Sequence, residues 1–432
     1  MNYSHLMQRL EGWLKGHPWA WIPTAFLAKG VSTVTFAVIS VLAFKRLGMD
    51  NAQVCMHVAL LYLPWLFRPL ASVLVLRLMS LRRWIVLCEL CMAVALFAVA
   101  LCVSFKGTHV GVMLWLMVHS VVGVIHDAAV DKYFRMNAPL TIRRSFGGIT
   151  SVFYRVALLF GQGVLLMVVG NMETLTRDVA GAWRFLFYAM SLFFLLLAVG
   201  NLLLLPKPAP IEEGTPFSFK SRWMEPVKDF FAQKGIVSVL FFLALFLLPE
   251  LLVEKVGMLF LVDAGHTGGL ALSPQEFGFV QGTIGVFALS IGGVLGGMAV
   301  HRHGVGRWLW PMALAFTITN VTYLFLAAYM PTNIWLISLS MGVKFMGLGF
   351  GSTAYMVSLI AFSRDDSGEL RPERLAVCSS VMAFATLLFT ALSGYLMEWL
   401  GYYRFFWLVV ACSLVTWCVT FLAKVDPLAG KK

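Results

Sequence analysis

The sequence has few charged residues. Asp, Glu, Lys and Arg make up 12% of its 432 residues, whereas hydrophobic residues make up 60%. Soluble domains carry about 25% charged residues, so this composition excludes a soluble globular protein. The sequence also lacks the roughly ten-residue segments of alternating polarity from which a transmembrane barrel is built. Apolar runs of about 20 residues recur along the whole chain instead, and they predict an all-α membrane protein.

Motifs for nucleotide, metal and covalent chemistry are missing as well. There is no Walker A sequence, so we do not expect ATP-driven transport by this chain alone. The seven cysteines all lie in apolar runs, and Cys88 and Cys91 have CxxC spacing without a second ligand pair. We interpret the cysteines as buried small hydrophobic residues. With no Ser/His/Asp or Cys/His arrangement either, we expect no enzyme activity, no metal and no cofactor.

The apolar runs predict twelve membrane spans. Their approximate limits are residues 21–44, 52–76, 84–105, 111–134, 146–170, 182–205, 235–262, 274–300, 307–329, 333–362, 375–397 and 403–423. Before them, residues 1–20 carry Leu6, Leu10, Trp13 and Leu14 at helical spacing, which predicts an amphipathic segment on the cytoplasmic membrane surface. We recognise no cleavable signal peptide, so the first span is expected to act as an uncleaved signal.

The basic residues gather in alternate loops. The net charge of +12 therefore follows the positive-inside pattern of membrane proteins rather than indicating nucleic-acid binding, and it predicts that both termini are cytoplasmic. A polar cytoplasmic linker, residues 206–234, divides the chain into six-span halves, residues 21–205 and 235–423, which a tail of residues 424–432 follows. An amphipathic helix is expected at residues 217–231. This organisation predicts the major facilitator fold, in which substrate binds between the halves.

Charged residues inside the spans are the functional candidates, because each costs about 2.5–3.5 kcal/mol in a bilayer. Asp127 and Asp131 are four residues apart and share one helix face. Asp131 is close to the expected end of its span, so a gating role and a simple interfacial position are both open. Asp127 lies one turn deeper, where we expect it to bind substrate or a proton, with Arg155 as its partner.

The seventh span carries a second pair of acids. Glu250 and Glu254 are also four residues apart, and two carboxylates this close in a low-dielectric site do not both ionise easily. Together with Lys255 they are candidates for proton coupling. The alternative is a static ion pair, for example between Glu254 and a lysine.

Four basic residues, Lys29, Arg68, Arg155 and Lys344, are distributed over the spans of both halves. Arg grips carboxylates bidentately and Lys acts as a point charge, so these residues indicate an anionic substrate. The alternative is that they only compensate the acids. His126 is a further candidate for substrate contact or proton relay, although a lone histidine in a helix is more often a hydrogen-bonded structural residue.

The fourth span also carries a recognisable motif. His126-Asp127 followed by Asp131-Lys132-Tyr133 resembles the Gln-Asp-Ile-x-x-Asp-x-Tyr/Trp motif of AmpG-type muropeptide permeases, a branch of the major facilitator superfamily. Similar segments extend over nearly the whole chain: Tyr154-Arg155, Gly161-Gln162-Gly163, Gly268-Gly269-Leu270, Gly347 to Tyr355, and Glu398-Trp399-Leu400-Gly401-Tyr402. The resemblance adds Gln162 and Tyr355 to the candidate substrate-binding residues.

Some positions depart from the family pattern. His126 stands where the family has Gln, and Val73 and Leu76 replace an expected Pro and Asp before Arg77. The short-loop motif that latches the outward-facing state in many such transporters therefore looks degraded. Arg77 remains a gating candidate together with Asp131.

The resemblance implies a proton-driven permease that imports cell-wall muropeptides across the bacterial inner membrane. Its partners would be an anionic glycopeptide or sugar derivative, protons and the lipid bilayer, and we expect a monomer. The alternatives are a major facilitator transporter of another solute, such as a sugar, an acyl-CoA-like anion or an exported drug, and a membrane receptor that transports nothing.

Overall fold

The computed structural model describes residues 17–75, 78–103, 109–143, 146–206, 224–233, 235–364, 371–422 and 430, and within these ranges every regular element is a helix. Several predicted features fall outside the described residues. They are the N-terminal amphipathic segment as far as residue 16, Arg77, linker residues 207–223, and nearly all of the C-terminal tail. The described part of the linker contains one helix, α13 (Glu225–Phe231).

The N-terminal half contains six spans. In chain order they are α2 (Pro18–Val34), π-helical η1 (Thr35–Ile39) and α3 (Ser40–Arg46); α4 (Asn51–Leu61), α5 (Leu63–Leu66) and α6 (Arg68–Leu74); α7 (Leu81–Cys102); α8 (His109–Asn137); α10 (Phe146–Leu158), π-helical η2 (Leu159–Leu165) and α11 (Leu166–Thr176); and α12 (Val179–Leu204). A short helix, α9 (Leu140–Arg143), connects the fourth span to the fifth.

The C-terminal half contains the other six. They are α14 (Ile236–Leu245) and α15 (Leu248–Val262); α16 (Pro274–Phe277), π-helical η5 (Gly278–Gly285) and α17 (Val286–His303); α18 (Val305–Ile318) and α19 (Val321–Tyr329); α20 (Ile334–Phe362); α21 (Pro372–Leu400); and α22 (Tyr402–Leu422). A single 3-10 turn, η4 (Gly265–Thr267), lies between the seventh and eighth spans.

The predicted all-α architecture is confirmed. Within the described ranges, eleven helices are long and apolar enough to cross a membrane, and a bent helix pair brings the number to twelve. That pair is the second span, which was predicted at about residues 52–76 and which bends by 46° between Leu66 and Arg68. Pro64 and Pro69 flank the bend, and because each lacks a backbone N–H, the helical hydrogen bonding is interrupted there.

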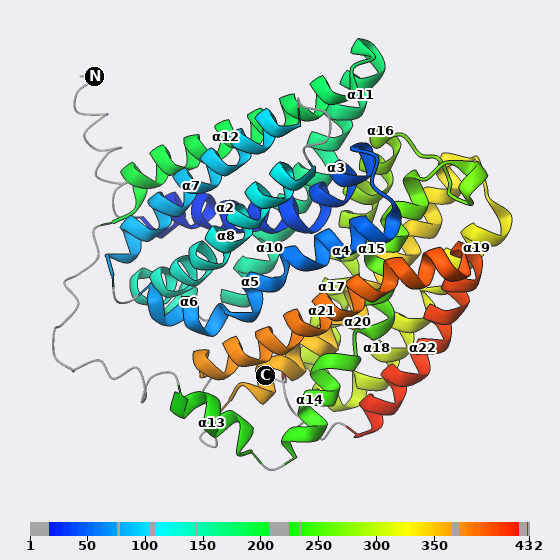
Figure 1. Cartoon of the computed structure of the whole chain (residues 1–432). Coiled ribbons are helices and arrows are strands. Elements are labelled where there is room, and N and C mark those ends of the chain that lie inside the picture. The colour runs from blue at the N-terminus through cyan, green and yellow to red at the C-terminus, as the bar shows by residue number, and fades with distance from the viewer. Residues whose placement is uncertain are drawn as a thin grey trace, which may run out of the picture.

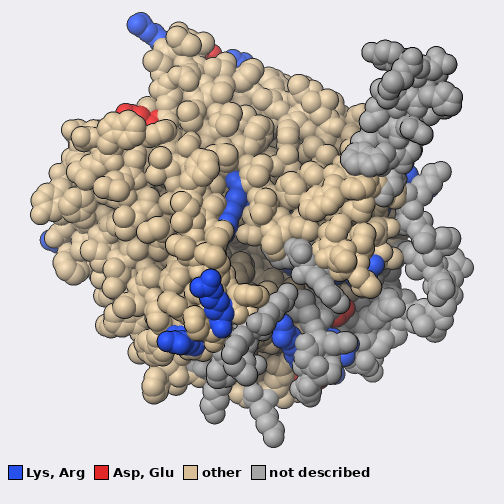
Figure 2. Space-filling model, turned by 180° about the vertical axis from the view of Figure 1, so that it is seen from behind, with Lys and Arg blue, Asp and Glu red and all other residues tan. Residues whose placement is uncertain are grey.

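The two halves lie side by side, as Figure 1 shows, with α7, α8 and α12 in one bundle and α18, α20 and α22 in the other. Large apolar side chains such as Val94 and Leu196 are exposed on the outer faces of the bundles, where a bilayer would cover them. On the face in Figure 2 most side chains carry no charge, and the Lys and Arg side chains gather mainly in the lower part of the view. The chain is a multi-pass membrane protein.

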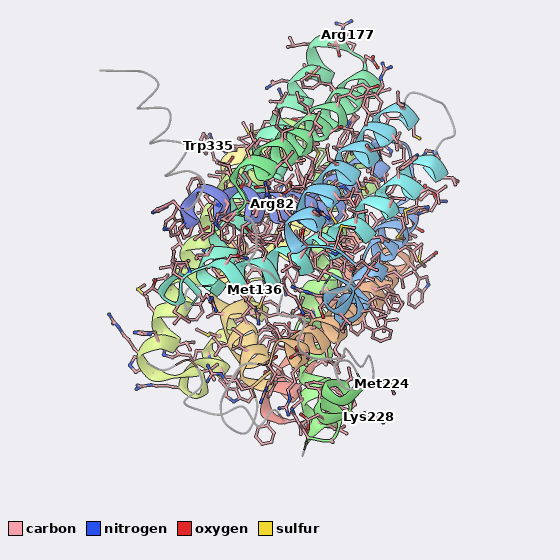
Figure 3. All side chains as sticks on the ribbon, turned by 90° about the vertical axis from the view of Figure 1, so that its left-hand side faces the viewer. Arg82, Met136, Arg177, Met224, Lys228 and Trp335 are labelled. Carbon is pink, nitrogen blue, oxygen red and sulfur yellow. The ribbon has the colours of Figure 1, made fainter. Side chains whose placement is uncertain are left out.

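The bundle has two distinct ends. We call the end that carries α13 the linker end, and the other the opposite end. In Figure 3, Met224 and Lys228 near and on α13 lie at the bottom of the molecule, and Arg177, between α11 and α12, lies at the top.

Glycines bring the fifth and eighth spans into backbone contact across the two halves. A Cβ added to Gly282 in η5 would lie 2.3 Å from the Cα atom of Gly163 in η2 and 2.4 Å from the carbonyl oxygen of Gln162. Real Cβ atoms do not approach other atoms so closely, so only glycine fits at position 282. Small residues allow such close helix contacts in membranes.

At the opposite end the halves are joined by hydrogen bonds around Asp263, which follows α15. The Asp263 carboxylate accepts hydrogen bonds from Asn51 Nδ2 at 2.6 Å and from the Tyr402 hydroxyl at 2.5 Å, and it forms an ion pair with Lys45 Nζ at 2.7 Å. Nearby, the Ala52 backbone N–H donates to Glu398 Oε1 at 2.8 Å. Lys45, Asn51 and Ala52 come from the N-terminal half and the remaining residues from the other, so these contacts close the opposite end of the bundle.

Candidate substrate-binding site

Four charged side chains of the N-terminal half meet in one cluster. Lys29 Nζ lies 2.7 Å from an oxygen of Asp127 and 2.7 Å from an oxygen of Asp131. Arg68 Nη2 lies 2.7 Å from the second oxygen of Asp127 and 3.0 Å from that of Asp131. Each cation therefore bridges both acids. We call these four residues the N-half cluster, and its formal charges sum to zero.

The sequence builds this cluster from three spans. Asp127 and Asp131 project from the same face of α8, as their spacing predicts. Lys29 faces them from α2, and Arg68 is the first residue of α6, immediately after the bend in the second span. Asp127 lies ten residues before the end of α8, or about 15 Å at 1.5 Å per residue, which is about half the thickness of a hydrocarbon core.

The cluster is open to different degrees at its two acids. The Asp127 side chain is 2% exposed, whereas that of Asp131 is 17% exposed and that of Arg68 is 23% exposed. The cluster is therefore accessible from the side of Asp131 and Arg68, while Asp127 forms its closed end. The prediction that Arg155 pairs with Asp127 is wrong. Lys29 and Arg68, from the first two spans, bind both oxygens of the Asp127 carboxylate instead.

The charged residues of the C-terminal half form two ion pairs. Lys255 Nζ lies 2.6 Å from Glu254 Oε1 on the same helix, α15. Lys344 on α20 binds Glu250 on α15. Each acid of the seventh span thus has its own lysine, so the two carboxylates do not share one site as two unpaired acids would. We call these four residues the C-half cluster, and its formal charges also sum to zero.

Lys255 connects the two halves. Its Nζ donates a second hydrogen bond, of 2.7 Å, to the carbonyl oxygen of Ala37 in η1 of the first span. It also lies 5.6 Å from the centre of the Tyr62 ring, at the junction of α4 and α5. Lys255 is fully buried, but the Glu254 side chain is 32% exposed. A buried ammonium is therefore held by a carbonyl, an aromatic face and a carboxylate that solvent reaches.

The structure does not bring the other candidate residues into these clusters. Arg155 donates from Nη1 to the Ser290 carbonyl at 3.3 Å, and among the described residues it has no ion pair with an acid. Gln162 donates to the Gln281 carbonyl at 2.9 Å, at the contact of η2 with η5. Tyr355 is buried in the C-terminal half, where its hydroxyl donates to the Leu243 carbonyl at 2.9 Å.

His126 points away from the cluster next to it. It is fully buried, and its Nε2 lies 3.2 Å from Glu89 Oε1 on α7. Glu89 was not singled out from the sequence as a candidate site residue, and this pairing was not predicted. The remaining gating candidate, Arg77, lies outside the described residues. In the part of the chain that the structure describes, no group of three His, Cys, Asp or Glu side chains could hold a metal ion.

Both clusters have the chemistry of exchangeable ion pairs. A neutral set of paired charges in a partly dry site binds an added proton or anion only by giving up one of its internal pairs. Guanidinium and ammonium groups set free in this way bind carboxylates or phosphates. The arrangement therefore links the protonation of an acid to the availability of a cation.

Sequence comparison finds relatives of low identity, and no protein-family model matches the chain. The chain is 23% identical to an uncharacterised protein of Haemophilus influenzae, over 76% of this chain and 74% of that protein. It is 22% identical to the putative transporter AmpG 4 of Rickettsia conorii, over 77% of each. It is 21% identical to the anhydromuropeptide permease of Escherichia coli, over 77% of this chain and 64% of that permease.

Solved structures match over almost the full length. The nucleoside transporter NupG superposes with a TM-score of 0.71 at 15% identity, over 96% of this chain and all of that one. A D-xylose–proton symporter superposes with a TM-score of 0.68 at 15% identity, over 95% and 98% of the two chains. These likenesses confirm the major facilitator fold.

The chain thus has the fold of major facilitator transporters. Its sequence relatives include AmpG-type muropeptide permeases, in agreement with the motif in α8.

Proposed function

We propose that this protein is a proton-coupled symporter that imports muropeptides, or other anhydro-amino-sugar fragments of the cell wall, across the bacterial inner membrane. The linker end would face the cytoplasm, with both chain termini on that side, and the transporting unit would be a monomer. The name of one sequence relative, the anhydromuropeptide permease, supplies the substrate class. The basic residues concentrated in the loops of the linker end support the orientation.

The observation that carries the proposal is the position of Asp127. Its carboxylate is nearly closed to solvent, lies ten residues before the end of α8, and is held between two cations. When Asp127 takes up a proton, the N-half cluster acquires one excess positive charge. Lys29 and Arg68 are then free to bind a carboxylate of the substrate. When the proton leaves, the carboxylate of Asp127 competes for the same cations and displaces the substrate.

The C-half cluster supplies a second proton site in this mechanism. Glu254 is the more exposed of its two acids, so water can deliver a proton to it. Protonation removes the counter-charge of Lys255, whose other hydrogen bond ties α15 to η1 in the other half. The state of Glu254 thereby acts on the contact between the halves, which rock against each other during alternating access. Glu250 and Lys344 complete this site, and Asp131 would act as the gating residue next to Asp127.

Uptake into proteoliposomes with an imposed pH gradient tests the proposal. The wild-type protein should accumulate a labelled anhydromuropeptide when the outside is acidic, and collapse of the gradient should abolish accumulation. Asp127→Asn and Glu254→Gln should each lose accumulation driven by the gradient. Accumulation that needs no gradient would refute proton coupling, and unchanged accumulation in both variants would remove these two acids from it.

A second candidate function is transport of a neutral solute such as a sugar or nucleoside. The balanced charges of the N-half and C-half clusters favour it, because a neutral solute needs no excess cation. The two superposed transporters bear the names of a nucleoside transporter and a D-xylose–proton symporter. A competition panel separates the candidates: excess unlabelled nucleoside or pentose should leave muropeptide uptake unchanged, and inhibition by these solutes alone would favour the second function.

A further inference from the structure

A buried polar network lies in the N-terminal half, behind the face of α8 that carries Asp127. Glu89 Oε1 on α7 accepts a hydrogen bond of 2.6 Å from Asn201 Nδ2 on α12 and lies 3.2 Å from His126 Nε2 on α8. Asn201 Oδ1 in turn accepts a hydrogen bond of 2.6 Å from the hydroxyl of Thr24 on α2. Glu89, His126 and Asn201 are all fully buried. The network therefore joins four spans of one half.

Within the described ranges, no lysine or arginine forms an ion pair with Glu89. Among the described residues its ion-pair partner is His126, while the nearby cations Lys29 and Arg68 are bound to Asp127 and Asp131. A carboxylate without a counter-charge is strongly disfavoured in a dry interior. A single proton, either on the Glu89 carboxyl or on the His126 imidazole, would neutralise the pair. In both forms its net charge is zero.

We infer that Glu89 and His126 form a proton-binding pair that holds one proton in the closed interior of the N-terminal half throughout transport. All four residues of the network belong to the same half. Alternating access in this fold moves one half against the other largely as a rigid body, so the network stays closed in every state of the cycle. This proton is therefore distinct from one that is taken up and released at Asp127 or Glu254.

The pair acts as a positioning device for the N-half cluster. His126 and Asp127 are consecutive on α8, so their side chains diverge by about 100°. Anchoring His126 to Glu89 on one side of α8 fixes the rotation that turns Asp127 toward Lys29 and Arg68 on the other. Other titratable groups near the pair are Asp127 itself and His119, which precedes His126 by about two turns of α8 and whose Nε2 lies 3.2 Å from the Ser32 hydroxyl oxygen.

The pH dependence of stability tests for the proton. Above about pH 8, Glu and His side chains of an unfolded chain carry no proton, whereas the folded pair carries one. The stability of the wild-type protein should then fall with rising pH. Its folding equilibrium constant should decrease about tenfold for each pH unit. Glu89→Gln keeps the shape and the hydrogen-bonding groups but cannot bind the proton. Its stability should lack this decline between about pH 8 and 9.5.

Thermal unfolding of the full chain in detergent micelles gives the measurement, with Glu373→Gln as the control. Glu373 is a carboxyl in the first turn of α21, outside this network, and its variant should retain the decline of the wild type. A decline in Glu89→Gln equal to that of the wild type would overturn the inference, because Glu89 would then bind no proton in the folded chain.

Transport tests whether the proton stays in place. Glu89→Gln should retain accumulation driven by a pH gradient, whereas Glu89→Leu, which cannot anchor His126 or Asn201, should lose most of it. Loss of accumulation in Glu89→Gln with exchange of labelled substrate retained would show that this proton moves, and would overturn the inference. The transport experiment rests on the proposed function. If the proposed function is wrong, the wild-type protein will not accumulate the substrate, and the pH dependence of stability alone then tests whether Glu89 and His126 hold a proton.

Discussion

Lys255 on α15 and Ala37 in η1 are 218 positions apart in the chain, yet a hydrogen bond of 2.7 Å joins the ammonium of the first to the carbonyl oxygen of the second. The contact crosses between the two halves. Because the same ammonium binds Glu254, a carboxylate of one half is linked to the backbone of the other by a single side chain. The charge of Glu254 and the packing of the first span are therefore not independent.

Removal of the two partners of this ion pair should have unequal effects on stability. Glu254→Gln leaves a fully buried ammonium without its counter-charge, which costs about 3–5 kcal/mol when an ion pair is buried. Lys255→Met leaves a carboxylate that water reaches and removes one hydrogen bond, at a cost of about 1 kcal/mol. Thermal unfolding in detergent should rank wild type above Lys255→Met and Lys255→Met above Glu254→Gln. The reverse order would show that Lys255 is not buried as described.

A second prediction concerns the charge balance of the N-half cluster. Asp127→Asn leaves two cations with one carboxylate, and Lys29→Gln in the same chain restores the balance. The double variant should therefore be more stable than the sum of the two single effects, by about 1–3 kcal/mol.

The matched control for this cycle combines Asp127→Asn with Arg155→Gln. Arg155 contacts Ser290 rather than the cluster, so the two effects should add to within about 0.5 kcal/mol. Coupling as large in the control as in the Lys29 cycle would contradict the geometry of the cluster.

A methyl group at Gly282 should disrupt the contact of the fifth span with the eighth. Its Cβ would meet backbone atoms of Gly163 and Gln162 at 2.3–2.4 Å, and backbone cannot move aside as a side chain can. We expect Gly282→Ala to lose about 1–3 kcal/mol of stability. Gly297→Ala is the control, because no atom lies within 4 Å of the added Cβ. Equal unfolding temperatures of the two variants would refute this close contact.

The contacts of Asp263 that join the two halves at the opposite end predict the reactivity of a native cysteine. Cys55 is fully buried, and its Cβ would lie 2.7 Å from a Cβ added to Gly394 on α21. It follows Asn51 on α4 by one turn. Asp263→Ala removes the common acceptor of Lys45, Asn51 and Tyr402, so this end should open more often.

A membrane-impermeant maleimide, added from the side that the opposite end faces, should then label Cys55 several-fold faster than in the wild type. Asp178→Ala is the control, since Asp178 lies at the same end but caps α12 within one half. The signal should vanish when Cys55 is replaced by Ser. A rate unchanged by Asp263→Ala would mean that Asp263 does not hold this end closed.

The fold was accessible from the sequence because a bilayer requires long apolar runs and lets few charges into them. The i, i+4 spacing of Asp127 and Asp131 also predicted their common face correctly. Their partners were not predictable in this way, because Lys29 and Arg68 come from other spans and only the packing of helices brings them near. Arg155 was the wrong choice for this reason.

Some other features of the site could not be predicted from the sequence. Nothing in the residue types of η1 indicates a π-helix, and the carbonyl of Ala37 is a backbone group that every residue has. The bend beside Arg68 did have a signal, since Pro64 and Pro69 stand on both sides of it. Glu89 and His126 are 37 positions apart, and each reads as an isolated polar residue until α7 and α8 are packed together.

The π-helical segment of the first span has a consequence for the directions of its side chains. A π-helical turn accommodates an additional residue in an α-helix, and each residue turns an α-helix by about 100°. In the first span η1 separates Lys29 in the N-half cluster from Lys45 at the opposite end. If the same number of residues formed a regular α-helix instead, the two lysines would be rotated by about 100° relative to each other, and they could no longer face Asp127 and Asp263 at the same time. In this stretch, the type of helix constrains the protein as strongly as the identity of its residues.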